Sequence, residues 1–416
     1  MMNRRRIGVA IFATILLLPQ ISMAQFDFPF HGFLEYGVGS RIVSNEEKTD
    51  DMLLNEARLQ LEFSRDADIA FFNFKTDFIY DEFLEESDVD IREANITLFP
   101  YDLWELKIGR QILTWGTGDL VFANDLFPKD WKSFFIGRDD EYLKAPVTAA
   151  KLSFYMDIGT LDAVVTPKFT PDTYIDGERM SYWGMTGITG EPFVDDKPDQ
   201  TFEDAEYHFR FAKNMGGLEL ALYGYKGFFK RPLGFDPEQG VGIFPELAVY
   251  GVSGRTTFLG GIVNLETAYY DSLDDKDGDD PFIENSILKT IIGFEKEIVK
   301  NLTGSVQYFS EWMQDYEDYE ASVRAIEQPV LKEENHDWIT LRLTNLRKQQ
   351  TLILSFFGYY SPAENDWHLR PKATYKMSDQ IQLAAGANFF FGENDYTFFG
   401  QLEDNSNLYF RIRYLY

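Results

Sequence analysis

The feature that most constrains the fold of this chain is an alternation of apolar and polar residues over segments of about ten, repeated many times between turn residues. In Leu53–Phe63, most odd positions are apolar, whereas the even positions include Glu56, Arg58, Gln60 and Glu62. Successive side chains of a β-strand point to opposite faces, so each such segment forms a strand with one apolar and one polar face. Helical periodicity is nearly absent, and the chain is therefore all-β.

We count eighteen candidate strands, and the connections between them alternate in length. Those after even-numbered strands are tight, such as Asp66-Ala67-Asp68, whereas those after odd-numbered strands are mostly long and include Gly116–Tyr142 and Pro171–Thr201. Short turns at one rim and long loops at the other are typical of an outer-membrane barrel, with the short turns in the periplasm. The strands are expected to begin near residues 32, 52, 68, 89, 103, 145, 160, 203, 217, 247, 261, 286, 302, 337, 350, 366, 380 and 407.

Strands can cross hydrocarbon only when the sheet closes, because each unpaired backbone group costs several kcal/mol there. The sequence thus predicts a transmembrane antiparallel up-and-down β-barrel of about 18 strands. A barrel of that size is wide enough for an aqueous lumen, whereas about eight strands would leave an interior filled by side chains.

Both ends of the chain fit export to the bacterial outer membrane. Residues 1–24 read as a signal peptide, in which Arg4, Arg5 and Arg6 precede an apolar run that is too short to span a bilayer as a helix. The barrel is then expected to occupy residues 25–416. Its last strand carries Leu408, Phe410, Ile412, Tyr414 and Tyr416 on one face, and we expect the barrel-assembly machinery to engage this strand.

The charge of the chain excludes some partners. The formal net charge is −29, which argues against nucleic acid because phosphates would be repelled, and the chain has no cysteine for disulfides. Acidic clusters such as Asp81–Asp90 and Asp271–Asp280 fit solvated loops beside lipopolysaccharide. Asp275, Asp277, Gly278 and Glu284 partly match a calcium loop, but its first ligand position is Leu273, so no metal site is predicted.

Strand alternation assigns a set of basic residues to the inner wall of the barrel. Those on the late strands lie near the first strands after closure, so part of the wall is predicted to be basic and to favour anionic solutes. The alternative is that these residues form ion pairs that stiffen a polar wall. The predicted channel-lining residues are Arg58, Lys75, Arg210, Arg255, Arg342, Arg370, Arg411 and Arg413.

Aromatic residues fall into two groups. Trp104, Trp312, Tyr360 and Trp367 lie near strand ends and fit the aromatic girdles at the two membrane interfaces. By contrast, three tyrosines point inward by alternation, where they either stack on sugar rings or fill space. These three are Tyr223, Tyr225 and Tyr409.

The segment Lys107–Trp131 ends a strand in Gly109-Arg110-Gln111 and continues into Trp115-Gly116 and Asp119. This pattern resembles that of porin-like outer-membrane proteins, including the alginate-export type, and the resemblance implies a channel, in that branch for an anionic polysaccharide. Arg110 is then a constriction residue or, alternatively, a structural residue at the strand end. Strict alternation places Arg110 on the lipid face unless Gly109 forms a bulge.

Enzymatic chemistry finds little support in the sequence. The four histidines have no zinc-type spacing, and a Gly-x-Ser-x-Gly elbow and a phosphate-binding P-loop are both absent. A barrel phospholipase with serine and histidine near the rim is the one enzymatic alternative. We therefore expect no catalytic residues and no cofactor.

The predicted function is a porin or channel for passive diffusion of small polar or anionic solutes across the outer membrane. The alternative is a plugged barrel with a structural or adhesive role. The two long connections, Gly116–Tyr142 and Pro171–Thr201, discriminate between these functions, because sealing the lumen would exclude a pore.

Overall fold

The computed structural model describes residues 30–184, 187–326 and 330–416, so the predicted signal peptide lies outside the described residues. Eighteen antiparallel strands form one closed sheet, in which β1 pairs with both β2 and β23. The closing pair runs from Phe33 opposite Leu415 to Arg41 opposite Asn407. No edge of the sheet is left open along this seam, as a wall in hydrocarbon requires.

The barrel strands begin within three residues of the predicted positions, which confirms the predicted fold class and strand number. They are β1 (His31–Arg41), β2 (Met52–Ala67), β3 (Ala70–Asp81), β4 (Glu86–Tyr101), β5 (Trp104–Gln111), β6 (Val147–Met156), β7 (Gly159–Thr166), β11 (Glu206–Met215), β12 (Leu218–Phe228), β15 (Glu246–Phe258), β16 (Gly261–Ser272), β17 (Ile287–Val299), β18 (Leu302–Met313), β19 (Asn335–Arg347), β20 (Leu352–Ser361), β21 (Asp366–Lys376), β22 (Ile381–Gly392) and β23 (Asn407–Leu415).

The remaining elements are short and belong to the connections. They are α2 (Trp131–Ile136), η1 (Asp140–Leu143), β8 (Tyr182–Trp183), β9 (Ile188–Thr189), β10 (Asp195–Asp196), β13 (Gly234–Asp236), β14 (Val241–Ile243), α3 (Tyr316–Val323) and η2 (Gly400–Asn405). Among the described residues, no helix has the length and apolar character needed to cross a membrane.

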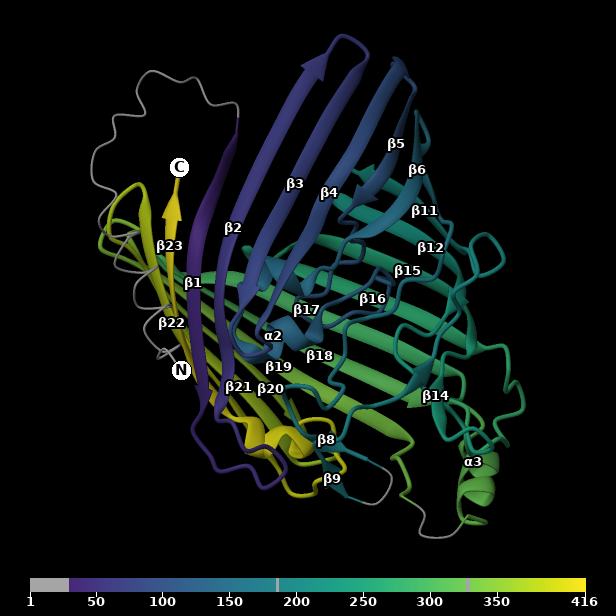
Figure 1. Cartoon of the computed structure of the whole chain (residues 1–416). Coiled ribbons are helices and arrows are strands. Elements are labelled where there is room, and N and C mark those ends of the chain that lie inside the picture. The colour runs from purple at the N-terminus through teal and green to yellow at the C-terminus, as the bar shows by residue number, and fades with distance from the viewer. Residues whose placement is uncertain (1–29, 185–186, 327–329) are drawn as a thin grey trace.

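The two rims differ as the sequence predicts. Figure 1 shows the short turns, such as that between β2 and β3, at the top, and α3, β8, β9 and β14 at the opposite, long-loop end. The β11–β12 turn uses Gly216 and Gly217 with φ of 62° and 97°, values that glycine adopts readily because it has no Cβ. Two connections at the long-loop rim, residues 82–85 and 362–365, are also short.

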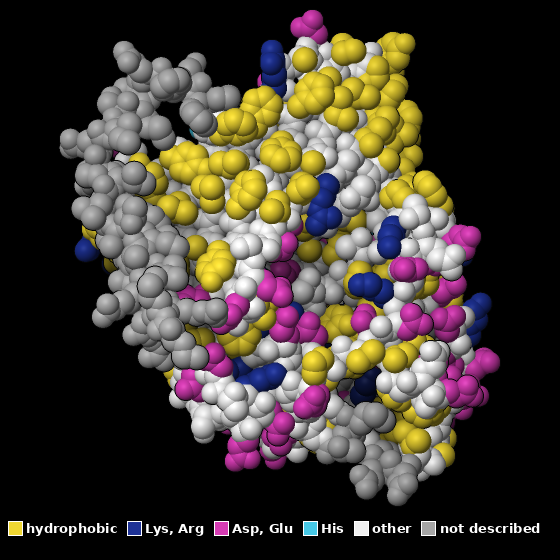
Figure 2. All heavy atoms as spheres, viewed as in Figure 1, with side chains coloured by type: hydrophobic (Ala, Val, Ile, Leu, Met, Phe, Trp, Pro, Cys, Tyr) yellow, Lys and Arg dark blue, Asp and Glu magenta, His cyan; other side chains and the backbone are white. Residues whose placement is uncertain are grey.

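The outer face of the barrel is apolar. Exposed side chains on it include Phe78, Leu265, Val306, Leu341 and Phe410, and Figure 2 shows hydrophobic side chains gathered toward the short-turn end. The predicted girdle residues Trp312 and Trp367 are exposed near the other strand ends, and Trp367 stacks on Tyr360 with ring centroids 3.9 Å apart. This surface fits a lipid environment.

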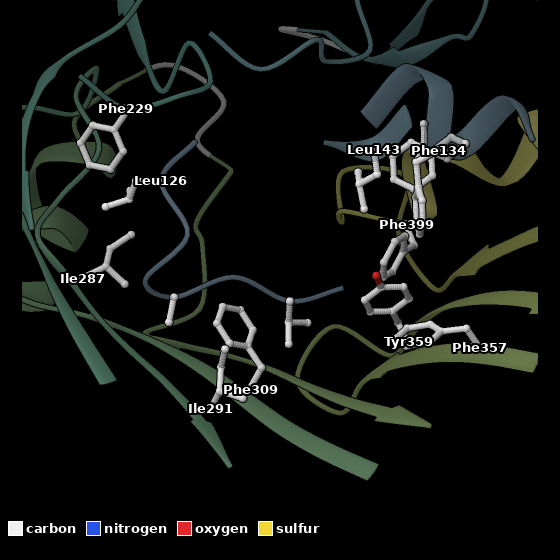
Figure 3. Packing of buried hydrophobic residues seen from close by; sticks show 14 of the residues in the cluster. Leu126, Phe134, Leu143, Phe229, Ile287, Ile291, Phe309, Phe357, Tyr359 and Phe399 are labelled. Atoms are coloured by element: carbon white, nitrogen blue, oxygen red, sulfur yellow. The ribbon is translucent and has the colours of Figure 1, made fainter. Parts of the chain in front are cut away.

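The hydrophobic core lies inside the barrel, where two long connections pack against the inner wall. We call residues 112–146, between β5 and β6, the first inner loop, and residues 167–184 and 187–205, between β7 and β11, the second inner loop. In Figure 3, Leu126 of the first loop lies beside Ile287 of β17, whereas Phe134 and Leu143 lie toward Phe399 and Tyr359. The loops thus complete an interior that eighteen strands alone would leave open.

Candidate functional site

The lumen is the candidate site, and the first inner loop is its main content. Its early part is anchored to β16 by Glu266, which is 1% exposed. The Glu266 carboxylate accepts hydrogen bonds from the backbone of Thr117 and Gly118 and, at 3.1 Å, from the Asn124 amide. Gly116 has φ of 81°, and a Cβ there would come within 3.0 Å of a Glu266 oxygen, so glycine allows the close approach.

After this first anchor, side chains of the wall donate hydrogen bonds to backbone carbonyls of the first inner loop. The hydroxyls of Tyr359 and Tyr270 donate to Leu120 and Ala123, respectively, each at 2.8 Å. Farther along the loop, the side-chain amides of Asn388 and Asn407 donate to the carbonyl of Phe135 at 2.9 and 3.0 Å. These wall residues come from β16, β20, β22 and β23, whereas the loop begins at the end of β5, so the loop crosses the lumen to reach them.

Ion pairs then join loop carboxylates to basic residues of the wall. Arg342 of β19 contacts Asp119 at 2.8 Å, and Arg370 of β21 contacts Asp140 at 3.0 Å. On β23, Arg411 contacts Asp139 at 2.8 Å, and Arg413 contacts Glu141 at 3.2 Å. Four of the predicted lining arginines therefore hold the first inner loop in place.

These arginines affect the pKa values of three carboxyl groups of the first inner loop. Burial alone would raise the pKa of Asp139 and Asp140, but the nearby cations outweigh it and hold both pKa values below the ordinary range. For Asp139 the cations are Arg411 and Arg413, and for Asp140 they are Arg370 and Lys372. At Glu141, burial raises the pKa by more than Arg413 lowers it, so the pKa lies above the ordinary value.

The second inner loop lies against the first. The Asp172 carboxylate accepts from the backbone of Lys129 at 2.8 Å and from the Trp131 indole at 3.0 Å, and burial raises the pKa of Asp172. Farther on, Arg179 pairs with Asp81 at the end of β3 and donates to the carbonyl of Leu53 at 3.0 Å. Both long connections named by the sequence analysis thus fold inward from the strands that carry them.

The other predicted lining residues also belong to the inner wall. Arg58 is buried between Glu56 at 2.9 Å and Asp77 at 2.6 Å, below the ring of Tyr142. Lys75 lies 3.3 Å from Glu62, and Arg210 lies 3.3 Å from Asp162. Arg255 is exposed and is opposite Glu219 and Asn264 in the two neighbouring strands. The structure brings these residues onto one face, but largely as ion pairs, and not as a free basic stripe.

For Arg110, the contacts favour the alternative of a structural residue at the strand end over that of a constriction residue. Gly109 has φ of 123°, yet the β4–β5 register continues through it without a shift, so alternation places Arg110 on the face of exposed Ile108. Its guanidinium donates to the carbonyl of Ile91 at 2.5 Å, beside Asp90 at 3.7 Å. Arg110 therefore caps a backbone carbonyl of β4 beyond the end of β5, which is a structural role at the strand end.

The three inward tyrosines are packed or hydrogen-bonded. Tyr225 is buried and donates to Glu206 at 2.7 Å, and the Tyr223 hydroxyl lies 2.9 Å from that of Ser253. Tyr409 is buried against Gly137, where a Cβ would lie 2.2 Å from its ring. These contacts favour the space-filling role over stacking on a sugar.

Sequence reasoning missed the residues that organise the lumen, namely Glu266 and the loop carboxylates Asp119 and Asp139–Glu141. The run Arg138-Asp139-Asp140-Glu141 was a signal, since three consecutive acids in a long connection need basic partners when they are buried. The carboxylates of the calcium-like segment have protein partners instead, because Asp275 accepts from the backbone of Gly278 at 3.0 Å and Glu284 pairs with Lys332, which lies outside the segment. Within the described ranges, no three metal-ligating side chains gather.

Comparisons with known proteins place the fold in the outer membrane. OccD3 (OpdP) of Pseudomonas aeruginosa is 11% identical, with a TM-score of 0.52 over 94% of this chain and 91% of that one. OccAB1 of Acinetobacter baumannii is 9% identical, with a TM-score of 0.53 over 93% and 95%. Wzi of Escherichia coli, an outer-membrane carbohydrate-binding β-barrel involved in group 1 capsule assembly, is 9% identical, with a TM-score of 0.51 over 92% and 84%.

No family model and no curated protein sequence matches the chain. The fold is that of the 18-stranded outer-membrane porins. At identities near one in ten, this likeness shows the fold alone, so the function has to be argued from the lumen.

Proposed function

We propose that this chain is an outer-membrane channel for passive diffusion of small polar solutes, with no catalytic step. The observation that carries the proposal is that charged side chains between the first inner loop and the wall keep contact with water. Asp119 is 36% exposed beside Arg342, and Asp140 is 35% exposed beside Arg370. Since both pairs lie inside a closed wall, the water that reaches them is lumen water, and this supports a passage that the loop narrows.

The anionic preference predicted from the wall arginines has weaker support. Arg342, Arg370, Arg411 and Arg413 are each neutralised by a loop carboxylate, so they do not form a free path for anions. The same pairing argues against an anionic polysaccharide, which the resemblance of Gly109–Asp119 to alginate-export porins implies. That substrate stays a prediction.

We also propose that the channel lies in the outer membrane and is inserted there by the barrel-assembly machinery. The apolar outer face fits outer-membrane lipid and lipopolysaccharide of a Gram-negative envelope, and the C-terminal strand β23, which closes the barrel, fits recognition by the assembly machinery. Removal of a signal peptide before residue 25 belongs to the same proposal.

A plugged barrel with a structural or adhesive role is the second candidate, because both inner loops cross the lumen and the first carries hydrophobic side chains to the wall. The similarity to Wzi, a carbohydrate-binding barrel, gives such a role a precedent in this fold. Single-channel recording of the refolded chain in a planar bilayer separates the two. Steady openings support the channel, whereas a folded barrel that never conducts supports the plug.

A further inference from the structure

The geometry points to a lumen that passes small cations in preference to anions, because the first inner loop presents its carboxylates to lumen water and recesses the arginines that hold them. This inference rests on the proposed channel function. It reverses the sign of the selectivity that the inward-facing arginines suggest in the sequence.

In each pair between a carboxylate of the first inner loop and a wall arginine, the carboxylate is the more exposed partner. Asp140 is 35% exposed, whereas its partner Arg370 is 6% exposed. Glu141 and Arg413 are 39% and 13% exposed, and Asp139 and Arg411 are 24% and 4% exposed. A solute in the lumen therefore meets the carboxylate before it meets the guanidinium.

Aromatic rings explain why the arginines are recessed. The guanidinium carbon of Arg370 lies 3.7 Å from the ring centroid of Phe134, and that of Arg413 lies 3.8 Å from Phe33. Arg342 lies over Phe357 at 4.7 Å. A planar guanidinium stacks well on a ring while it pairs with a carboxylate at its edge, so one side of each cation faces protein instead of water.

Asp139 and Asp140 stay charged under the conditions of a conductance measurement. The cations beside Asp139 and Asp140 hold both pKa values below the ordinary range despite burial. Near neutral pH these two residues are therefore ionised, and each is partly exposed to lumen water beside its cation. The effect is local, since charges farther than about 8 Å are largely screened at physiological salt.

The long-loop rim adds a second, independent contribution of the same sign. The connection between β16 and β17 holds Asp274, Asp275, Asp277, Asp279, Asp280 and Glu284 against the single basic residue Lys276. The second inner loop holds nine acidic and three basic residues. Figure 2 shows Asp and Glu side chains gathered over the half of the molecule opposite the hydrophobic band. A rim with a net negative charge raises the local concentration of cations at the mouth.

The test is the reversal potential of the refolded full chain in a planar bilayer under a KCl gradient. We expect a K⁺ to Cl⁻ permeability ratio above one at 0.1 M, which falls toward one at 1 M salt, where the screening length is only about 3 Å. The Glu141→Gln variant removes one exposed loop carboxylate while Arg413 keeps Glu35 at 2.8 Å. We expect this variant to lower the ratio.

Asp66→Asn is the matched control, because it removes the same charge from an exposed end of β2 at the short-turn rim. We expect its ratio to equal that of the unmodified chain. Conducting barrels with a ratio below one, or a ratio that Glu141→Gln leaves unchanged, would overturn the inference and leave the channel function standing. A correctly folded barrel without conductance would overturn the channel function, and the inference with it.

Discussion

Removing the charge of Glu266 should release the early part of the first inner loop and widen the lumen. In Glu266→Gln, the side-chain volume is nearly kept, but one carboxylate oxygen becomes an amide that cannot accept from the loop N–H groups. The carboxylate accepts from Thr117, Gly118 and Asn124, and buried hydrogen bonds to a charged group contribute about 1.5–3 kcal/mol each. Losing two of them weakens the anchor by about 3–6 kcal/mol.

Loss of this anchor should mobilise only the early part of the first inner loop, because the barrel strands keep the backbone hydrogen bonds between them. We therefore expect Glu266→Gln to fold into a heat-resistant barrel, to show larger and noisier single-channel openings, and to become sensitive to protease within residues 112–126. The matched control is Glu219→Gln, an exposed glutamate of β12 opposite Arg255. If the conductance and the cleavage pattern of Glu266→Gln match those of the unmodified chain, the anchoring role of Glu266 is refuted.

Three further predictions concern the loop and the wall. Gly137→Ala should disrupt packing at the end of α2, because Gly137 has φ of 89° and an added Cβ would clash with the Tyr409 ring. The assay is proteolysis of the first inner loop. Gly240→Ala is the control, because an added Cβ there has no atom within 4 Å. Phe410→Arg, on the exposed face of β23, should lower the free energy of unfolding in lipid by about 2–4 kcal/mol, and a change no larger than that of Phe410→Ala would contradict a lipid-facing position. Since the folded pKa values of Asp139 and Asp140 lie below the ordinary value of 3.8, their pairs stabilise the loop above that pH and lose this effect as pH falls through the lower folded values. The contribution of these two pairs to the protease resistance of residues 112–146 should thus stay constant from about pH 8 to pH 5 and be lost only in strong acid.

The fold was predictable because each strand and turn is encoded by a pattern of residues that are close together in the sequence. The alternation in β2 or β23 places side chains on two faces whatever the neighbours are, and the turn residues fix where each hairpin reverses. Closure then follows from the need to pair every backbone group in hydrocarbon. The inward position of Arg342 and Arg411 followed from the same alternation.

The role of these arginines was not predictable in the same way. Strand periodicity states which face a side chain occupies, but it carries no information about a connection of 35 residues that folds back over that face. Asp119 and Arg342 are 223 positions apart, and Asp139 and Arg411 are 272 apart. Only the path of the first inner loop brings these charges together.

The sequence by itself determined an eighteen-stranded closed barrel with an apolar outer face, a polar inner face and two distinct rims, because each of these follows from residue patterns within single strands and turns. The tertiary structure alone decided what fills the barrel. Two long connections enter the lumen, Glu266 and the wall arginines hold the first of them, and its carboxylates take the exposed positions. The physical reason is that charge pairing between distant segments depends on where the chain returns in space, which no local period encodes.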